Sequence, residues 1–240
     1  MVRKFLILAI LTLFSWLVMS PLAWGQKQGP EVIRGRESAP ARGAESAYDQ
    51  GLKHLEGGDY DQAVKSLQQA VKNNPDSADA YYRLGLAYKA QGDQDQAVQS
   101  LKKAVGLNSK LTPAREALGN IYGEQGLKLL REGEADKAVT ILQEAISQNP
   151  KNDGAFNNLG VALWQQGRLA ASLEAFQQAA ALNPDNTQAQ FNLGVIQYSL
   201  GNKNATVEQY AILTLRDPAA AEELFRIIQG TSQVATPFRF

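Results

Sequence analysis

Apolar side chains recur along residues 44–230 at intervals of three and four positions, in segments that come in pairs. This spacing places them on one face of an α-helix, which predicts amphipathic helices that bury that face. A glycine follows the first segment of a pair, as at Gly58 and Gly92, where it can adopt the backbone that turns one helix into the next. The pattern therefore predicts an all-α chain built from helix–turn–helix units.

The helix pairs are copies of one another with a period of 34 residues. Each copy has an early glycine, a second glycine seven residues later and a large apolar residue nine residues after that. The early glycines are Gly51, Gly85, Gly160 and Gly194. A glycine at this position lets neighbouring helices approach closely. One pair cannot bury its apolar face alone, so stacked copies must share a continuous core.

The repeat resembles the tetratricopeptide repeat. The family pattern is present as Leu84-Gly85-x-x-Tyr88 followed by Ala97, Leu101 and Ala104, and as Leu159-Gly160-x-x-Leu163 followed by Phe176, Ala179 and Pro184. The resemblance implies a right-handed superhelical solenoid of five helix pairs plus a C-terminal capping helix, in a domain spanning residues 44–230. The implied repeats are residues 44–77, 78–111, 112–152, 153–186 and 187–220, with the capping helix at 221–229.

The third copy, residues 112–152, is seven residues longer than the others. Gly119 and Gly126 both fit the early-glycine position of its first helix. Seven residues add about two helical turns, so this helix is expected either to be lengthened by ~10 Å and project beyond its neighbours or to kink at its glycines. Whether the insertion is a tolerated addition or a recognition element stays open.

Residues 1–25 have the order of a secretory signal peptide. A basic head precedes an apolar run over residues 5–19, and Ala23 and Gly25 supply the small residues of a cleavage site. Cleavage there would leave Gln26 as the new N-terminus. The sequence therefore predicts an exported protein, in the periplasm or another extracytoplasmic space.

The alternative is an uncleaved membrane anchor formed by residues 5–24. A spanning helix needs about 20 apolar residues, and this run is shorter, which favours cleavage. A membrane is thus an expected partner only if the signal is retained. Residues 26–43 show no apolar periodicity and are expected to be a disordered linker.

The amino-acid composition excludes several kinds of structural, metal-binding and nucleic-acid-binding site. The 240 residues contain no cysteine and one histidine, which excludes disulfides, zinc knuckles, iron–sulfur clusters and multi-histidine metal sites. The 24 basic and 24 acidic residues balance, so the chain lacks the basic surface that nucleic acid requires. His54 has no accompanying nucleophile motif and is expected to be a packed or partly exposed ring. We therefore expect no cofactor, no metal, no nucleic-acid partner and no enzymatic activity.

The resemblance implies that the first helices of the pairs line a concave groove, where a protein or extended peptide binds. The groove residues it implies are Tyr82, Arg83, Lys89, Asn120, Asn157, Asn158, Trp164, Phe191, Asn192 and Tyr198. Asn158 and Asn192 occupy the same repeat position one unit apart, and in some relatives a ladder of such asparagines holds a peptide backbone. An amide suits this role because it can donate to a carbonyl and accept from an N–H. Asparagine is also common at this position of the family, so a purely structural role is the alternative.

Two other interpretations concern charged residues. Arg83 and Lys89, together with Asn120, approach the set with which chaperone-binding relatives hold a C-terminal carboxylate. Glu116 and Glu124 could form an acid–base pair on the long helix, which would make the chain an enzyme or an accessory subunit that acts on an envelope polymer. We expect instead an exported, non-enzymatic scaffold that binds a protein or peptide, and by analogy with bacterial relatives we expect it to act in assembly of an envelope complex.

The tail, residues 231–240, ends in an aromatic residue, as outer-membrane barrel proteins do. The rest of the chain shows no alternation of the kind that barrel strands require. The tail is therefore expected to be a disordered end, and docking into the groove of a neighbouring molecule is the alternative.

Overall fold

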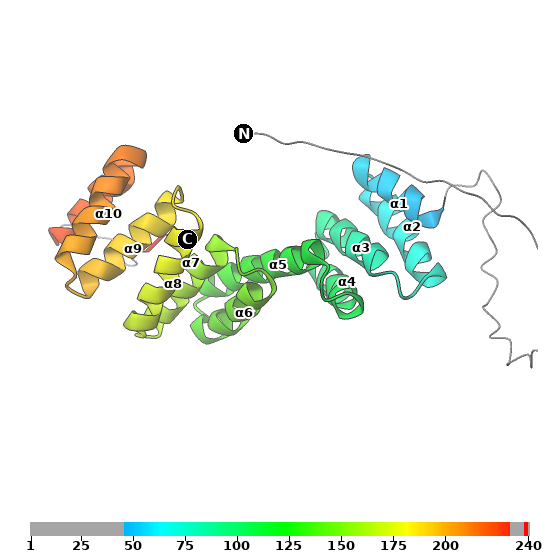
Figure 1. The fold of residues 1–240 in the computed structure, drawn as a ribbon, viewed down its shortest axis with the longest axis horizontal. Coiled ribbons are helices and arrows are strands. Elements are labelled where there is room, and N and C mark those ends of the chain that lie inside the picture. The colour runs from blue at the N-terminus through cyan, green and yellow to red at the C-terminus, as the bar shows by residue number, and fades with distance from the viewer. Residues whose placement is uncertain (1–45, 231–237, 240) are drawn as a thin grey trace, which may run out of the picture. The chain divides into compact units, whose positions relative to one another are not determined.

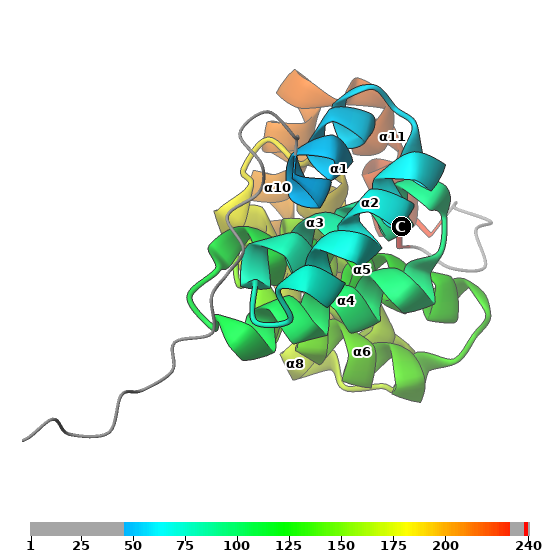
Figure 2. The same cartoon turned by 90° about the vertical axis from the view of Figure 1, so that its right-hand side faces the viewer.

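The computed structural model of the chain describes residues 46–230 and 238–239, which form helices and no strands. The helices are α1 (Ala47–Glu56), α2 (Tyr60–Asn73), α3 (Ala78–Gln91), α4 (Gln94–Leu107), α5 (Thr112–Arg131), α6 (Ala135–Gln148), α7 (Asp153–Gln165), α8 (Leu169–Leu182), α9 (Thr187–Ser199), α10 (Lys203–Arg216) and α11 (Pro218–Ile228). Each helix contacts the next in chain order, so the array grows by stacking (Figure 1). Figure 2 looks along the same array from the end formed by α1 and α2. The predicted all-α solenoid is confirmed.

Local sequence sets where the helices begin and end. Ser77 caps α3, with its hydroxyl oxygen accepting a hydrogen bond from the backbone N–H of Ala80 at 3.2 Å. In the turns after α1 and α3, Gly58 and Gly92 have φ angles of 74° and 87°, which side-chain-bearing residues rarely adopt. The turns predicted at these second glycines are confirmed.

The early glycines lie where two helices of a pair touch. A Cβ atom on Gly85 would lie 2.7 Å from Cγ of Leu101, and one on Gly160 would lie 2.6 Å from the Phe176 ring. Leu101 and Phe176 are fully buried, so neither can move aside without disturbing the core. The expected close approach at these glycines is confirmed.

The third pair keeps the same relationship at Gly126. A Cβ atom there would lie 2.4 Å from Cγ of Leu142, sixteen residues along the chain, as between Gly85 and Leu101. Gly126 therefore holds the repeat register, and the seven additional residues precede it. Helix α5 is uninterrupted over 20 residues, so the insertion lengthens the helix.

The added turns of α5 do not project freely. Leu118 and Ile121 are buried, and a Cβ atom on Gly119 would lie 2.6 Å from the Cβ of Asn149 in the following turn. The Arg115 guanidinium also donates a hydrogen bond of 2.9 Å to the carbonyl oxygen of Ser147. The expectation of a projecting helix is therefore wrong, because α6 and its C-terminal turn cover the extension. Figure 1 shows α5 leading from α1–α4 to α6–α11.

The last pair is closed by α11. Gly194 in α9 faces Leu224 of α11, whose Cδ2 would lie 2.8 Å from a Cβ on the glycine. Leu224 is fully buried, whereas Tyr210, at the position that holds Leu101 and Phe176 in earlier pairs, is partly buried and lies against Phe225. The capping helix thus supplies the core residue that α10 does not.

Buried apolar residues of α4–α11 form one core cluster, which includes Phe238 from the chain's end. A smaller cluster joins α1, α2 and α3. None of the helices in the described part of the chain is long and apolar enough to cross a membrane. The expected export signal and linker, residues 1–43, lie outside the described residues.

Candidate functional site

Three asparagines of α7 and α9 lie buried on one side of the array. Asn157, Asn158 and Asn192 have exposed fractions of 2%, 8% and 0%. The Nδ2 of Asn192 donates a hydrogen bond of 2.8 Å to Oδ1 of Asn157. A buried amide must satisfy its polar atoms within the protein. The amide pair therefore joins the first helices of the fourth and fifth pairs through Asn157 rather than through Asn158.

Asn192 also holds the backbone of Arg239. Its Nδ2 donates to the Arg239 carbonyl oxygen at 2.8 Å, and its Oδ1 accepts from the Arg239 N–H at 2.8 Å. With the bond to Asn157, both amide hydrogens and the amide oxygen are used. This arrangement fixes the orientation of the amide, because the opposite assignment would face N–H against N–H and oxygen against oxygen.

The side chain of Phe238 fills an aromatic pocket beside this amide. Its ring centroid lies 4.7 Å from that of Trp164 and 5.3 Å from that of Phe176. The ring is nearly parallel to Phe176, at 11°, and tilted by 57° to Trp164. Only 4% of Phe238 is exposed. A residue two positions from the end of the sequence is therefore as buried as the core of the array.

The side chain of Arg239 lies against an acidic wall, which is formed by Asp217 and Glu223. Its Nη2 lies 2.5 Å from a carboxylate oxygen of Glu223, and its Nη1 lies 3.4 Å from Oδ2 of Asp217. The guanidinium also lies over the ring of Phe191, 4.5 Å from the centroid. The other oxygen of Asp217 accepts from the Ala220 N–H and caps α11. The cap thus holds one of the two carboxylates in place.

These contacts correct the expectation for the tail. Phe238 and Arg239 lie against the array's own helices α7, α8, α9 and α11, so this part of the tail is not a disordered end. The rest of the tail, residues 231–237 and Phe240, lies outside the described residues.

The structure brings four of the ten groove residues inferred from the sequence together at this site: Asn157, Trp164, Phe191 and Asn192. Asn158, the next residue of α7 after Asn157, is buried. Tyr198 lies further along α9, with its hydroxyl donating 2.9 Å to the carbonyl oxygen of Ile228. It thereby ties α9 to the end of α11. It contributes no apolar pocket of the kind formed by Trp164.

The remaining four residues lie on α3 and α5, away from this site. The Arg83 guanidinium lies 5.2 Å from the Tyr82 ring centroid and 4.0 Å from the Asp79 carboxylate. Lys89 forms an ion pair of 2.9 Å with Glu124. The oxygen of the Asn120 amide accepts from Asn149 and Asn152 at 3.1 and 3.0 Å. The structure therefore engages each of these side chains within or between helices.

The charged residues of the alternative interpretations are separated. Glu116 and Glu124 are both exposed on α5, and Glu124 is paired with Lys89 across to α3. His54 is partly exposed in α1. Among the described residues, no group of histidines and carboxylates is arranged to hold a metal ion.

Sequence reasoning missed Phe176, Asp217, Glu223, Phe238 and Arg239. In the sequence, Phe176 is evident only as a residue of the repeat pattern, and Asp217 and Glu223 belong to no repeat position that indicates a site. The available signal was an arginine between two aromatic residues in a tail that otherwise has no apolar pattern. Only the folded array shows that these residues meet.

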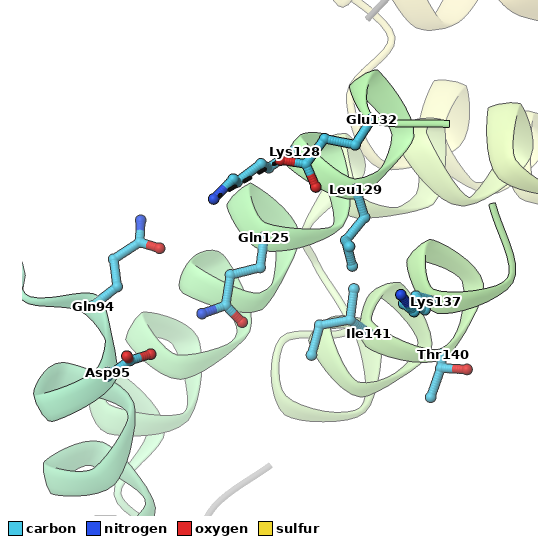
Figure 3. Close-up of a pocket in the computed structure, with 9 residues that line it drawn as sticks. All are labelled: Gln94, Asp95, Gln125, Lys128, Leu129, Glu132, Lys137, Thr140 and Ile141. Carbon is cyan, nitrogen blue, oxygen red and sulfur yellow. Dashed lines mark ion pairs between the residues drawn. The ribbon is translucent and has the colours of Figure 1, made fainter. Parts of the chain in front are cut away.

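A second hollow, of about 550 Å³, lies between α4, α5 and α6 (Figure 3). Leu129 and Ile141 form its apolar floor, while Lys128 and Glu132 on its rim lie 3.9 Å apart as an ion pair. Side chains of both charges and several neutral amides surround it. It lies where the long α5 leaves α4.

Comparison with solved structures shows which proteins have a similar fold. No curated protein sequence matches the chain. The crystal structure of MamA is similar, with a TM-score of 0.52 and 24% sequence identity over 72% of this chain and 96% of that one. YrrB, described as a TPR protein with an unusual peptide-binding site, has a TM-score of 0.53 and 19% identity over 75% of this chain and 90% of that one. PilF of Pseudomonas aeruginosa has a TM-score of 0.50 and 21% identity over 77% and 82% of the two chains.

The family model described as tetratricopeptide repeat matches residues 48–112, 124–187 and 167–233. These segments cover most of the described helices, and the unmatched stretch falls in the first half of α5, where the seven-residue insertion lies. The glycine register, the stacked helix pairs and this match agree. The chain belongs to the tetratricopeptide repeat family.

Proposed function

We propose that this protein is an exported, non-enzymatic scaffold that captures an extended segment of a protein partner in the groove formed by α7, α9 and α11. We further propose that it serves in assembly of a complex in the cell envelope, which rests on the export signal expected at residues 1–25. The family binds protein or peptide partners, and YrrB is described as having a peptide-binding site.

One observation supports binding of a peptide more than any other. The buried amide of Asn192 presents one donor and one acceptor side by side, at the spacing of a backbone N–H and C=O. A backbone offers this pair whatever its side chains, so such a grip accepts many sequences. The neighbouring aromatic pocket and acidic wall would then add preference for particular side chains.

A binding experiment with matched amide variants tests the proposal. Peptides selected from a random library on the full chain would be labelled, and their affinities measured by fluorescence anisotropy for three full-length chains. All three carry F238A/R239A, so that residues 238 and 239 do not compete for Asn192, and they differ in having Asn192 and Asn120 intact, N192A or N120A. N192A should weaken binding at least tenfold, about 1.4 kcal/mol, because the backbone loses two hydrogen bonds. N120A removes an exposed amide on α5 and should change the affinity less than twofold. Selected peptides that bind all three chains equally would move the binding site away from this groove.

A further inference from the structure

We propose that Phe238 and Arg239 are a tethered copy of the partner's binding motif. On this view the groove selects an extended segment with an aromatic residue followed by a basic one, and the partner must displace the chain's own tail. The inference rests on the proposed function. It adds the side-chain chemistry of the partner segment, and it explains how the tail limits the partner's access to the groove.

The aromatic preference comes from the pocket that holds Phe238. Trp164 and Phe176 contact the ring from two helices, and the ring is almost completely withdrawn from water. Stacked and tilted ring pairs at these distances are favourable in a way that a branched aliphatic side chain cannot reproduce. The pocket therefore fits a flat ring.

The preference for a basic residue at the position of Arg239 comes from the acidic wall. Asp217 and Glu223 place two carboxylates on one guanidinium, and the Phe191 ring adds a face on which it stacks. A guanidinium matches this set because its donors form a fixed fork and its plane can lie on a ring. An acidic side chain here would meet two like charges, so the partner should carry arginine, or less favourably lysine.

The hydrogen bonds from Asn192 to the backbone set the order of the aromatic and the basic residue in the motif. Asn192 bonds to both the N–H and the C=O of Arg239, so the residue at the grip sends its side chain to the acidic wall. The preceding residue then enters the aromatic pocket, because successive side chains of an extended segment point to opposite sides. Both bonds use ordinary peptide groups, so an internal segment of a partner fits as well as a chain end.

Tethering makes the tail an effective competitor. Residues 231–237 connect Gly230 at the end of α11 to Phe238, and a short tether of this kind holds its ligand at an effective concentration of the order of millimolar. The apparent association constant for a partner equals the intrinsic one multiplied by the fraction of molecules whose groove is empty. A weakly binding tail can therefore exclude weak partners and admit only those with a better match.

The test compares groove access in full chains that differ only in the tail. The probe is a fluorescent heptapeptide of residues 234–240, and its control has the same composition with the phenylalanine and arginine at 238 and 239 exchanged. Affinities would be measured for wild type and for the full-length double variant F238A/R239A. The double variant should bind the probe at least tenfold more tightly than wild type does, and should bind the exchanged peptide at least tenfold more weakly than the probe.

A second variant guards against misfolding of the first. R239E retains the phenylalanine at position 238 but reverses one charge opposite Asp217 and Glu223. The tail should therefore leave the groove, while the helicity measured by circular dichroism stays unchanged. Equal probe affinity of wild type, F238A/R239A and R239E would overturn the inference. So would equal binding of the probe and the exchanged peptide, because the order of the motif would then carry no meaning.

The proposed function can survive the failure of this inference. If library peptides lose affinity for N192A while the heptapeptide binds wild type and F238A/R239A equally, the groove binds peptides and the tail is not their copy. If N192A affects no peptide in chains that carry F238A/R239A, both proposals fall. A wild-type dimer by light scattering that becomes monomeric in F238A/R239A would show a tail exchanged between copies and would overturn competition within one molecule.

Discussion

The side-chain amide of Asn192 forms hydrogen bonds to both polar groups of the Arg239 backbone, each at 2.8 Å, across 47 positions of sequence. The amide is fully buried and its remaining hydrogen is donated to Asn157. A single side chain thus links the two stacked helices α7 and α9 to an extended segment. This linkage connects the stability of the array with the occupancy of its groove.

Loss of the Asn192 amide should destabilise the protein. N192A leaves the Asn157 oxygen and the Arg239 backbone without their partner, and we expect the free energy of unfolding to fall by about 1–3 kcal/mol. The measurement is urea denaturation followed by circular dichroism. N120A removes an exposed amide of α5 whose two hydrogen bonds can be replaced by water, so it should cost less than about 1 kcal/mol. A stability loss as large for N120A as for N192A would contradict the special place of Asn192.

Removal of the Phe238 ring should expose Trp164 to water. In a chain whose other tryptophans, Trp16 and Trp24, are replaced by phenylalanine, the emission of Trp164 should shift to longer wavelength in F238A. The stability lost should be about 1.4–3 kcal/mol, which is the docking free energy of a tethered ligand that excludes a competing peptide at least tenfold. The same substitution at Phe240 would serve as a comparison at a neighbouring aromatic residue. An unchanged Trp164 spectrum in F238A would contradict docking of the ring.

The glycines of the third pair should respond according to what faces them. G126A would force a Cβ into Leu142 and should cost about 1–3 kcal/mol. G119A would meet the Cβ and backbone N of Asn149 and the carbonyl oxygen of Ala145, none of which can rotate away, and should cost at least as much. G106A, with open space around it in α4, should instead stabilise by about 0.5–1 kcal/mol, because alanine favours helix. Urea midpoints of the three variants would give this order, and a stable G126A would show that the register is wrong.

The ion pair between Lys89 and Glu124 should matter little. Its side chains are 36% and 49% exposed, and ion pairs this exposed contribute about 0–1 kcal/mol. We therefore expect K89A to lower stability by less than about 1 kcal/mol and to leave peptide affinity unchanged. A large loss of peptide affinity in K89A would favour the carboxylate-holding set of Arg83, Lys89 and Asn120 over the Asn192 groove.

Export and cleavage are tested by the mass of the protein recovered from its native cells. Cleavage after Gly25 predicts a chain that begins at Gln26 and is found in the extracytoplasmic fraction. A chain that keeps Met1 and sediments with membranes would support the anchor formed by residues 5–24.

Much of the fold can be predicted from the sequence, because residues that pack against each other recur at the same spacing in each repeat. The pairing of Gly85 with Leu101 could be inferred from spacing alone, since the same residue types recur at the same offsets. The insertion was harder, because Gly119 and Gly126 lie seven residues apart and occupy nearly the same face of one helix. Only the contact with Leu142 shows which of them holds the register.

The site was predictable only in part for a related reason. Asn157, Asn192 and Trp164 stand at repeated positions, so family geometry indicates their side of the array. Phe238 and Arg239 belong to no repeat. Their partners are Asp217, which caps α11, and Glu223 within α11, where no periodic rule applies. Contacts between a single tail and a single cap leave no pattern in one sequence, and they become visible only when the chain is folded.

The most direct test of the central claim is hydrogen exchange at the backbone amide of Arg239, observed by NMR in the full chain. If Asn192 accepts from this N–H, exchange in wild type should be at least tenfold slower than in the free heptapeptide of residues 234–240, and N192A should abolish the protection. An Arg239 amide that exchanges in wild type as fast as in the free peptide would contradict the account.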